Sequence, residues 1–361
     1  PEPEEEEEEE EIVIQEEAPK PAKGRRSAAP KESAKPAPPA KKAPAPKAAP
    51  CCVGPGSVIL LERNKYQIAT LLAPGADSSI FKGKCIEGKQ MGKEVAIKVQ
   101  PRSRKTVYQV TTEYTTLRNL HSKPRAGLHI QTPLAYGCHN DEAYVLVSEL
   151  LGDNVLALVP QSGVLPPRTA LLLALQGVPL LEALHAAGYV HRDIKPDNMV
   201  LKRQGGFDQL FLIDFGTAEG LMDRNGARRT QPQMAEGTLA YMAVTCHDKE
   251  PLSPRDDLES FGWMLLRLLL GKLPWESYNV KQMPQIASAK RKMVAEGFGG
   301  VGGIDASMRA FFVQYFSYLH KLPADCATSH GALSEAVKKA WAANKNEFGA
   351  MPAPNKISFV K

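Results

Sequence analysis

The sequence predicts an α+β fold with two lobes: a small antiparallel sheet with one key helix, followed by a larger and mostly helical lobe. Three observations support this prediction. From Ser57 onward, short runs of alternating and β-branched residues are typical of strands. From Leu165 onward, long apolar runs are typical of buried helices. The chain of 361 residues is also long enough to bury a sizeable core and to carry a tail.

Changes in composition divide the chain into four predicted regions. We expect a disordered tail over residues 1–56, the small lobe over 57–150, the large lobe over 151–347 and a C-terminal extension over 348–361. The tail begins with successive glutamates that repel one another and continues with Pro, Ala and Lys repeats that offer no apolar face. Such segments cannot bury enough apolar surface to fold.

The predicted tail changes sign along its length. Residues 1–17 carry 11 acidic and no basic side chains, whereas residues 18–50 carry nine Lys and Arg against Glu32 alone. The basic part could bind an acidic partner such as nucleic acid or an acidic protein tail, and its clusters have roughly bipartite nuclear-import spacing. A solvated linker remains the simplest interpretation. No aromatic residues are interleaved with the basic ones, which disfavours nucleic-acid binding as the main activity.

The six cysteines and the apolar runs indicate the compartment. No two cysteines form a CxxC pair, so a zinc site is not expected, and their scatter suits reduced thiols inside the cell, in the cytoplasm and/or nucleus. No N-terminal stretch has the pattern of a signal peptide. The apolar run Ala170–Leu184 is interrupted and too short to span a bilayer, so we expect a buried helix and no membrane partner.

The small lobe is predicted from strand patterns and one helical pattern. The pattern indicates three successive strands, a helix and then a hairpin about the turn at Asn140-Asp141. The expected strands are Gln67–Leu72, Ser79–Cys85, Lys93–Val99, His129–Gly137 and Glu142–Glu149, and the expected helix is Thr106–Leu120.

The large lobe is predicted from apolar helical runs. A long helix over Leu165–Ala187 should be disturbed near Gly177 and Pro179, because both residues disfavour helix interiors. Asp257 opens a further apolar helix, where its carboxylate could hold the backbone of the loop that follows the first helix. Helices near Ser307–Leu322 and Leu333–Asn346 should close the domain, and Gly297–Gly303 reads as a flexible connection.

The strongest motif is His191–Asn198 (HRDIKPDN), followed by Ile213–Gly216 (IDFG). Together they are typical of the catalytic loop and metal-binding turn of a protein kinase. Asp193 would accept the proton of an incoming hydroxyl, and Lys195 would offset charge on the transferred phosphoryl group. The oxygen ligands of two Mg²⁺ ions would be Asn198 and Asp214. His191 is interpreted as a packed core residue.

A second motif, Val95–Lys98 (VAIK), lies in the third strand. In this pattern Lys98 grips the α- and β-phosphates of the nucleotide. The lysine needs an anionic partner, and the helical phase of the following segment supplies Glu113.

The turn that should cover the phosphates departs from the pattern. Where G-x-G-x-x-G is expected, the chain has Ala73–Ser78 (APGADS), and only Gly75 remains. Pro74 removes an N–H donor, and Asp77 places a negative charge near that of the nucleotide, so we expect Asp77 to point away. Weakened nucleotide binding, and with it a pseudokinase scaffold, is therefore the alternative to an active enzyme.

Over about residues 64–343 the chain resembles protein kinases, specifically the casein kinase 1 group with its vaccinia-related kinase relatives. Markers of this group are Glu149–Gly152 (ELLG), Gly237-Thr238 and Arg255–Ser260 (RDDLES). A further marker is the lack of Ala-Pro-Glu, where this chain has Ala243–Thr245. With Lys195 in the catalytic loop, the chain resembles the serine/threonine kinases and not the tyrosine kinases.

The resemblance implies a bilobal protein kinase fold that uses ATP and Mg²⁺ to phosphorylate serine or threonine in protein substrates. It also implies acidic or phosphorylated substrate surroundings and activity that does not require phosphorylation of the activation segment, Thr217–Thr238. Arg224, Arg228 and Arg229 in this segment could favour such substrates. The implied catalytic residues are Lys98, Glu113, Asp193 and Lys195; the nucleotide-binding residues are Gly75, Ile80, Ala96, Lys98, Glu149, Leu151 and Val200; and the metal ligands are Asn198 and Asp214. Backbone groups of Glu149 and Leu151 would bond the adenine edge, with Ser148 behind it.

Overall fold

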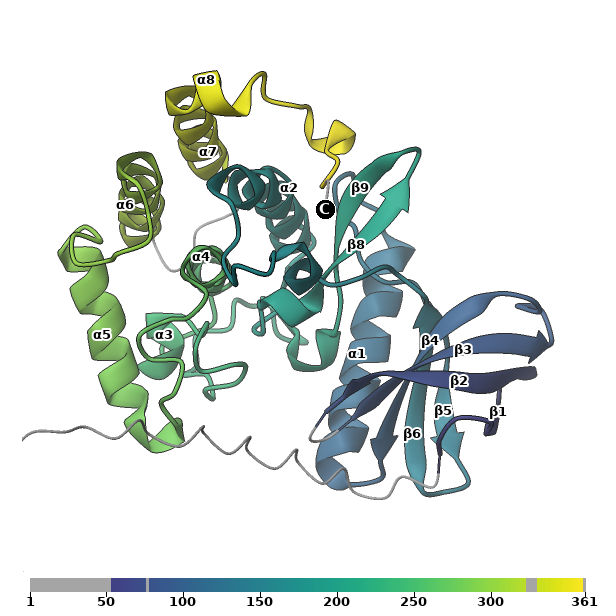
Figure 1. Ribbon diagram of the computed structural model, residues 1–361. Helices are drawn as coiled ribbons and strands as arrows, with labels where there is room; N and C mark the ends of the chain where they lie inside the picture. Colours follow the sequence, from purple (N-terminus) through teal and green to yellow (C-terminus); the bar gives the residue numbers. More distant parts are fainter. Residues whose placement is uncertain (1–52, 76–77, 323–329, 360–361) are drawn as a thin grey trace, which may run out of the picture. The chain divides into compact units, whose positions relative to one another are not determined.

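The computed structural model describes residues 53–75, 78–322 and 330–359, which belong to one compact unit (Figure 1). The predicted tail up to residue 52, with its acidic and basic segments, lies outside the described residues, and so does Asp77. Residues 53–56 already pack onto the domain: Val53 is buried, and the Gly56 N–H donates to the Ile68 carbonyl at 2.9 Å. The folded part therefore begins slightly before Ser57.

A six-stranded antiparallel sheet forms the small lobe, in the order β1-β2-β3-β4-β6-β5 (Figure 1). Its strands are β1 (Val58–Leu61), β2 (Asn64–Pro74), β3 (Ser79–Glu87), β4 (Glu94–Pro101), β5 (Pro133–His139) and β6 (Ala143–Glu149). The five predicted strands are confirmed, although the fourth begins at Pro133 and not at His129. The turn between β5 and β6 has Asn140 and Asp141 at φ 49° and 56°, the left-handed conformation that these residue types tolerate.

Strand β1 was not predicted, because its run of four apolar residues shows no alternation in the sequence. Its burial does alternate, with Ile59 and Leu61 buried and Val58 and Leu60 exposed. The predicted helix is α1 (Arg104–Ser122), which lies against the sheet at β4, β5 and β6. It begins with a capping box in which the Ser103 hydroxyl accepts from the Thr106 N–H.

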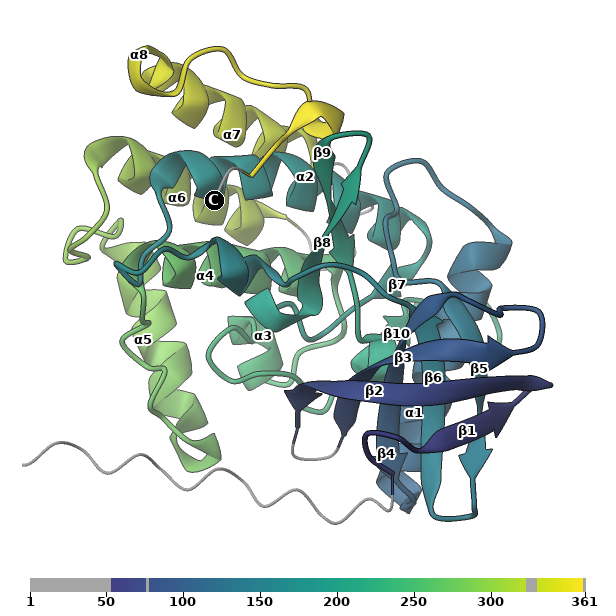
Figure 2. The same ribbon diagram turned by 45° about the vertical axis from the view of Figure 1, so that its right-hand side comes forward.

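The large lobe is mostly helical (Figure 2), and most of its buried apolar side chains form one cluster. Its longer helices are α2 (Pro167–Ala186), α4 (Pro254–Leu270), α5 (Met283–Ala295), α6 (Ala306–Lys321) and α7 (Gly331–Ala343). Shorter segments are α3 (Val244–His247), α8 (Lys345–Phe348), β7 (Tyr189–Val190), β8 (Met199–Gln204), β9 (Phe207–Leu212), β10 (Glu219–Gly220) and the 3₁₀ turns η1 (Val155–Leu158), η2 (Pro196–Asn198), η3 (Phe215–Thr217), η4 (Val280–Gln282) and η5 (Pro354–Lys356). The expected C-terminal extension also packs onto this lobe, with Phe348, Ile357 and Phe359 buried.

Helix α2 differs from the expectation of a disturbed helix, because it runs without a break through Gly177 and Pro179. A side chain at residue 177 would overlap the Phe261 ring of α4, so the glycine permits close packing of the two helices. Among the described residues, α2 is the one helix long and apolar enough to cross a membrane, but 78% of its apolar window is buried inside the domain. Core burial therefore accounts for its composition.

Replacing Gly177 by alanine should lower the free energy of unfolding by about 1–2 kcal/mol. Overpacking against Phe261 costs about 1–3 kcal/mol, and the better helix propensity of alanine offsets at most about 1 kcal/mol. Urea denaturation measures the change. Gly300→Ala is the control, because no atom lies within 4 Å of its added methyl group. Equal stability of the two variants would show that α2 and α4 separate without cost.

Candidate active site

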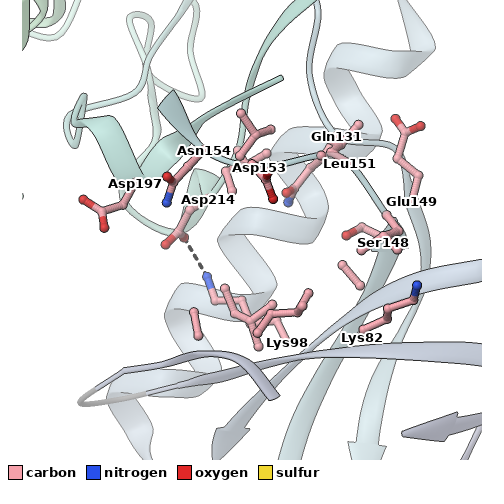
Figure 3. Close-up of a pocket in the computed structure, with 18 of the residues that line it drawn as sticks. Lys82, Lys98, Gln131, Ser148, Glu149, Leu151, Asp153, Asn154, Asp197 and Asp214 are labelled. Atoms are coloured by element: carbon pink, nitrogen blue, oxygen red, sulfur yellow. Dashed lines mark hydrogen bonds and ion pairs between the residues drawn. The ribbon is translucent and has the colours of Figure 1, made fainter. Parts of the chain in front are cut away.

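A cavity of about 440 Å³ lies between the sheet and the helical lobe (Figure 3). Most of the predicted nucleotide and catalytic residues line it: Ile80, Ala96, Lys98, Glu113, Glu149, Leu151, Val200 and Asp214. Gly75 does not line the cavity, and its N–H donates to the Ser78 carbonyl at 2.8 Å within the turn between β2 and β3. The cavity is not lined by the other predicted catalytic and metal-binding residues, which lie on the catalytic loop: Asp193, Lys195 and Asn198.

Lys98 joins three elements at the inner end of the cavity. Its Nζ lies 2.8 Å from Glu113 Oε2 on α1 and 2.6 Å from Asp214 Oδ1, and the second contact is marked in Figure 3. Gln131, which the sequence did not single out, donates to Glu113 Oε1 at 2.9 Å. The predicted pairing of Lys98 with Glu113 is confirmed, and Gln131 fixes the glutamate that holds the lysine.

These three charges set one another's pKa values. Burial alone would lower the pKa of Lys98, but the Asp214 and Glu113 carboxylates outweigh it and raise that pKa. Burial would raise the pKa of Asp214, yet Lys98 outweighs it and lowers the value to about 2. For Glu113 burial prevails, and the pKa is raised. Lys98 is therefore held as a cation, and Asp214 as an anion, at neutral pH.

The Asp193 carboxylate is fixed by donors on both oxygens. Oδ2 accepts from Lys195 Nζ at 2.6 Å and from Asn198 Nδ2 at 3.2 Å. Oδ1 accepts from the N–H and the hydroxyl of Thr238, at 2.9 and 2.8 Å. Lys195 also lies 3.3 Å from the Thr238 hydroxyl. The sequence assigned Thr238 no role beyond that of a marker of the casein kinase 1 group. The structure places it against the predicted base, Asp193.

Asp257 holds the backbone of the catalytic loop, as the sequence predicted. Its carboxylate accepts from the N–H groups of His191 and Arg192 at 2.7 and 2.8 Å, and it contacts His185 Nε2 at 2.9 Å. The predicted packing role of His191 is confirmed, because this fully buried ring lies edge-on to Phe215 at 4.9 Å. The catalytic loop and the metal-binding turn are thereby fixed to each other.

The proposed metal ligands fit magnesium by their chemistry. Asn198 Nδ2 donates to the carbonyl and carboxylate of Asp193, so its Oδ1 is the atom that could bind a metal. Together with Asp214 this gives two hard oxygen donors. Within the described residues no group of three or more His, Cys, Asp or Glu side chains could hold a metal. Mg²⁺ commonly binds through one or two carboxylates plus substrate phosphates, so a two-ligand site suits it.

The activation segment is held by glutamates. Arg192 NH1 lies 2.7 Å from Glu219 Oε2 and 3.5 Å from Glu236 Oε2. Glu219 also pairs with Arg229 at 3.1 Å, and Arg228 donates to the Leu252 carbonyl. Two of the three arginines that the sequence suggested for substrate binding are therefore engaged inside the domain. Internal carboxylates therefore already neutralise Arg192.

The connection between the lobes is fixed by the Glu149 side chain. Its Oε1 accepts from the N–H and hydroxyl of Thr132 at 3.1 and 2.8 Å, and its Oε2 lies 2.5 Å from Lys202 Nζ on β8. Ser148 and Gln131 line the cavity beside it, and so do Lys82 and Asp153, which were not predicted (Figure 3). For Lys82 a signal was available, since it lies two residues after Ile80 on the same strand face.

Comparison with known proteins gives one consistent family. A family model described as protein kinase domain matches residues 66–307. Casein kinase I homolog 1 of Saccharomyces cerevisiae is 32% identical over 63% of this chain and 42% of that protein. A probable casein kinase I homolog of Encephalitozoon cuniculi is 32% identical over 61% of this chain and 71% of that protein. The chain spans less than half the length of the first curated relatives.

A solved structure shares the fold. The structure of vaccinia related kinase 3 has a TM-score of 0.65 with this chain at 19% identity, and the match covers 84% of this chain and 94% of that one. This agrees with the predicted bilobal fold of an antiparallel sheet and a helical lobe.

Proposed function

This chain belongs to the protein kinase family, in the casein kinase 1 group, and we propose that it transfers the γ-phosphoryl group of ATP to serine or threonine hydroxyls of protein substrates. One observation carries the proposal: Lys98, Glu113 and Asp214 form one ion-pair set at the inner end of a cavity, and Asp193 lies beside it with both oxygens fixed. These are the charges that phosphoryl transfer requires.

The proposed roles follow from the contacts. Asp193 would accept the hydroxyl proton, because its carboxylate is oriented by four donors and remains an acceptor. Lys195, between Asp193 and Thr238, would place a positive charge beside the transferred group. Lys98, released in part from Asp214, would bind the nucleotide phosphates. Magnesium held by Asn198 and Asp214 would neutralise phosphate charge.

The adenine would lie between apolar side chains of the two lobes. Ile80 and Ala96 line the sheet side of the cavity, and Val200 on β8 lines the opposite side. Backbone groups of Glu149 and Leu151 would bond the purine edge. A cavity of about 440 Å³ suits a ligand of nucleotide size.

A preference for acidic or phosphorylated substrate surroundings is the finer part of this proposal. Of the three arginines in the activation segment, Arg224 is exposed, whereas Arg228 and Arg229 are bonded within the domain. We therefore place the preference on Arg224. A peptide library with acidic, phosphorylated and neutral residues around one acceptor tests it, and equal rates for all three sets would exclude the preference.

The tail and the compartment complete the proposal. The basic segment 18–50 would bind an acidic partner, either nucleic acid or an acidic protein tail, in the cytoplasm and/or nucleus. Binding of the full chain to an acidic polymer, compared with the chain lacking residues 1–50, tests this part separately.

The second candidate function is a pseudokinase scaffold. It is favoured by the turn at Ala73–Ser78, where the Gly75 N–H donates to the Ser78 carbonyl within the turn. Two measurements on the purified chain separate the candidates. An active kinase should transfer ³²P from ATP to casein, and Mg·ATP should raise its melting temperature because ligand that binds only the folded state stabilises it. If the chain shows neither transfer nor a shift of the melting temperature at millimolar Mg·ATP, the kinase function is rejected and the scaffold is favoured.

A further inference from the structure

The segment that follows the activation segment needs an anchor of its own. Residues 238–245 begin with Thr238, which holds the predicted base, and they lack the Ala-Pro-Glu of most protein kinases. The contacts of this segment show what holds it. Two helices beneath it, α4 and α5, supply the partners.

From α5, Lys290 reaches into the segment. Its side chain is fully buried, and its Nζ donates to the Met242 carbonyl at 2.5 Å and lies 3.4 Å from the Leu239 carbonyl. The amine lies 5.7 and 5.4 Å from the ring centroids of Trp263 and Trp275, close enough for cation–π attraction. Within the described part of the chain, no carboxylate lies within ion-pair distance of Lys290.

Neighbouring groups complete the same anchor. Trp275 Nε1 donates to the Ala240 carbonyl at 2.8 Å, between the two carbonyls that face Lys290. On α4, Glu259 Oε1 accepts from the Val244 N–H at 3.0 Å, and Asp256 accepts from the Thr245 hydroxyl at 2.5 Å. Backbone groups on both sides of the segment therefore have buried partners.

The free-energy cost of burying the Lys290 amine argues against a role in packing alone. Removing an ammonium group from water without an ionic partner is expensive, and an apolar chain of the same length would fill the space between two indole rings without that cost. What an apolar chain cannot supply is the pair of N–H donors to the loop carbonyls, which either protonation state of the amine retains.

We propose that Lys290 is a positioning residue for the transfer reaction: by fixing the Leu239 and Met242 carbonyls it holds Thr238 against Asp193 and shapes the loop that a substrate peptide contacts. The inference rests on the proposed kinase function. Lys290 does not touch the nucleotide cavity, so its effect should fall on the peptide substrate and not on ATP.

The charge state of Lys290 gives an independent prediction about stability. Burial lowers its pKa from the usual 10.5 to about 7, and Glu259 on α4 and Cys246 on α3 oppose this shift. The other charged or titratable groups nearby are His247 and Arg291. Between pH 7 and 10.5 the unfolded chain holds this proton and the folded chain does not, so stability rises with pH in this window.

Lys290→Met should remove that rise. Across this window, the unfolding equilibrium constant of the wild type should fall about tenfold per pH unit relative to the variant. Urea denaturation of both proteins at pH 7, 8 and 9 measures the ratio. A ratio independent of pH would mean that the amine is not held in the buried site.

The positioning role is tested with Lys290→Met and the control Lys292→Met, which changes an exposed lysine on the same helix. For Lys290→Met we expect kcat/KM for a peptide to fall about 10- to 100-fold, with the Kd for Mg·ATP within twofold and the melting temperature unchanged or higher. Should this variant not fold, Lys290→Gln, whose amide keeps a donor, replaces it with a smaller expected loss. Unchanged kcat/KM, or an equal loss in Lys292→Met, overturns the proposal.

Hydrogen exchange provides a readout that does not need activity. Amides of residues 238–245 should exchange at least about tenfold faster in Lys290→Met, with the catalytic loop and α4 unchanged. If the wild type transfers no phosphate, the kinase proposal fails on its own, and this measurement still decides whether Lys290 anchors the loop. Unaltered exchange in residues 238–245 refutes the anchor.

Discussion

Replacing Asp193 by asparagine should lower the rate of phosphoryl transfer by about 10²- to 10⁴-fold, the usual contribution of a positioned general base. The amide cannot accept the hydroxyl proton. Its NH₂ group would also face donors, since Lys195 and Asn198 point at one carboxylate oxygen and Thr238 at the other. Asp193 does not line the nucleotide cavity, so the Kd for Mg·ATP should stay within about threefold. Initial rates with a peptide substrate and calorimetric titration with Mg·ATP measure the two effects.

The control for Asp193→Asn is Asp141→Asn, at a turn between β5 and β6 where the side chain is 93% exposed. Asparagine tolerates the left-handed conformation of that turn, so the control should fold and act like the wild type. Transfer by Asp193→Asn at the wild-type rate would remove Asp193 from the role of base. Loss of transfer together with loss of ATP binding would indicate a collapsed site.

Much of this arrangement could be predicted because it is local in the chain. The loop containing Asp193, Lys195 and Asn198 spans eight residues, and its residue types follow from the chemistry of phosphate and magnesium. The pairing of Lys98 with Glu113 could be predicted because the lysine needs an anionic partner and helical phase supplies this glutamate. Asp257 was placed correctly since it opens a buried helix and therefore needs donors.

The remaining site residues depend on contacts between distant segments. Gln131 lies just before β5 and holds Glu113 across 18 positions, and nothing in its sequence context marks it. Lys290 has Arg291 and Lys292 beside it and reads as part of a solvated basic face, yet it is fully buried. Only the packing of α5 against residues 238–245, which no local pattern encodes, distinguishes Lys290 from its neighbours.

The turn between β2 and β3 shows how little a departure from a motif decides by itself. The sequence predicted weakened nucleotide binding from Ala73–Ser78, and this stays a prediction; in the structure the N–H of Gly75 bonds within the turn. The residues that we propose to bind the phosphates lie elsewhere: Lys98 on β4 and Asp214 in the metal-binding turn. Loss of the glycines removes backbone donors to the phosphates and leaves the ionic contacts, so the expected consequence is a raised KM for ATP with transfer retained.

The ionic contacts themselves are tested by Lys98→Met, which should lower kcat/KM for ATP by about 10²- to 10³-fold. Lys98 Nζ lies between Glu113 and Asp214, at 2.8 and 2.6 Å, and its removal leaves the buried Glu113 and the half-buried Asp214 carboxylates without a cation. Burial already raises the pKa of Glu113, so the glutamate should take up a proton, release its hold on β4 and let α1 move away from the cavity. Steady-state kinetics at varied ATP measures the loss.

The control is Lys84→Met, an exposed lysine on β3 that does not line the cavity, for which kcat/KM should change less than about threefold. Lys98→Met and Asp193→Asn should fail at different steps, since the first removes nucleotide binding and the second removes proton acceptance. A thermal-shift titration distinguishes them, because Mg·ATP should still stabilise Asp193→Asn and no longer stabilise Lys98→Met. An unaltered response of Lys98→Met to Mg·ATP would place the nucleotide outside this cavity, and with it the reaction.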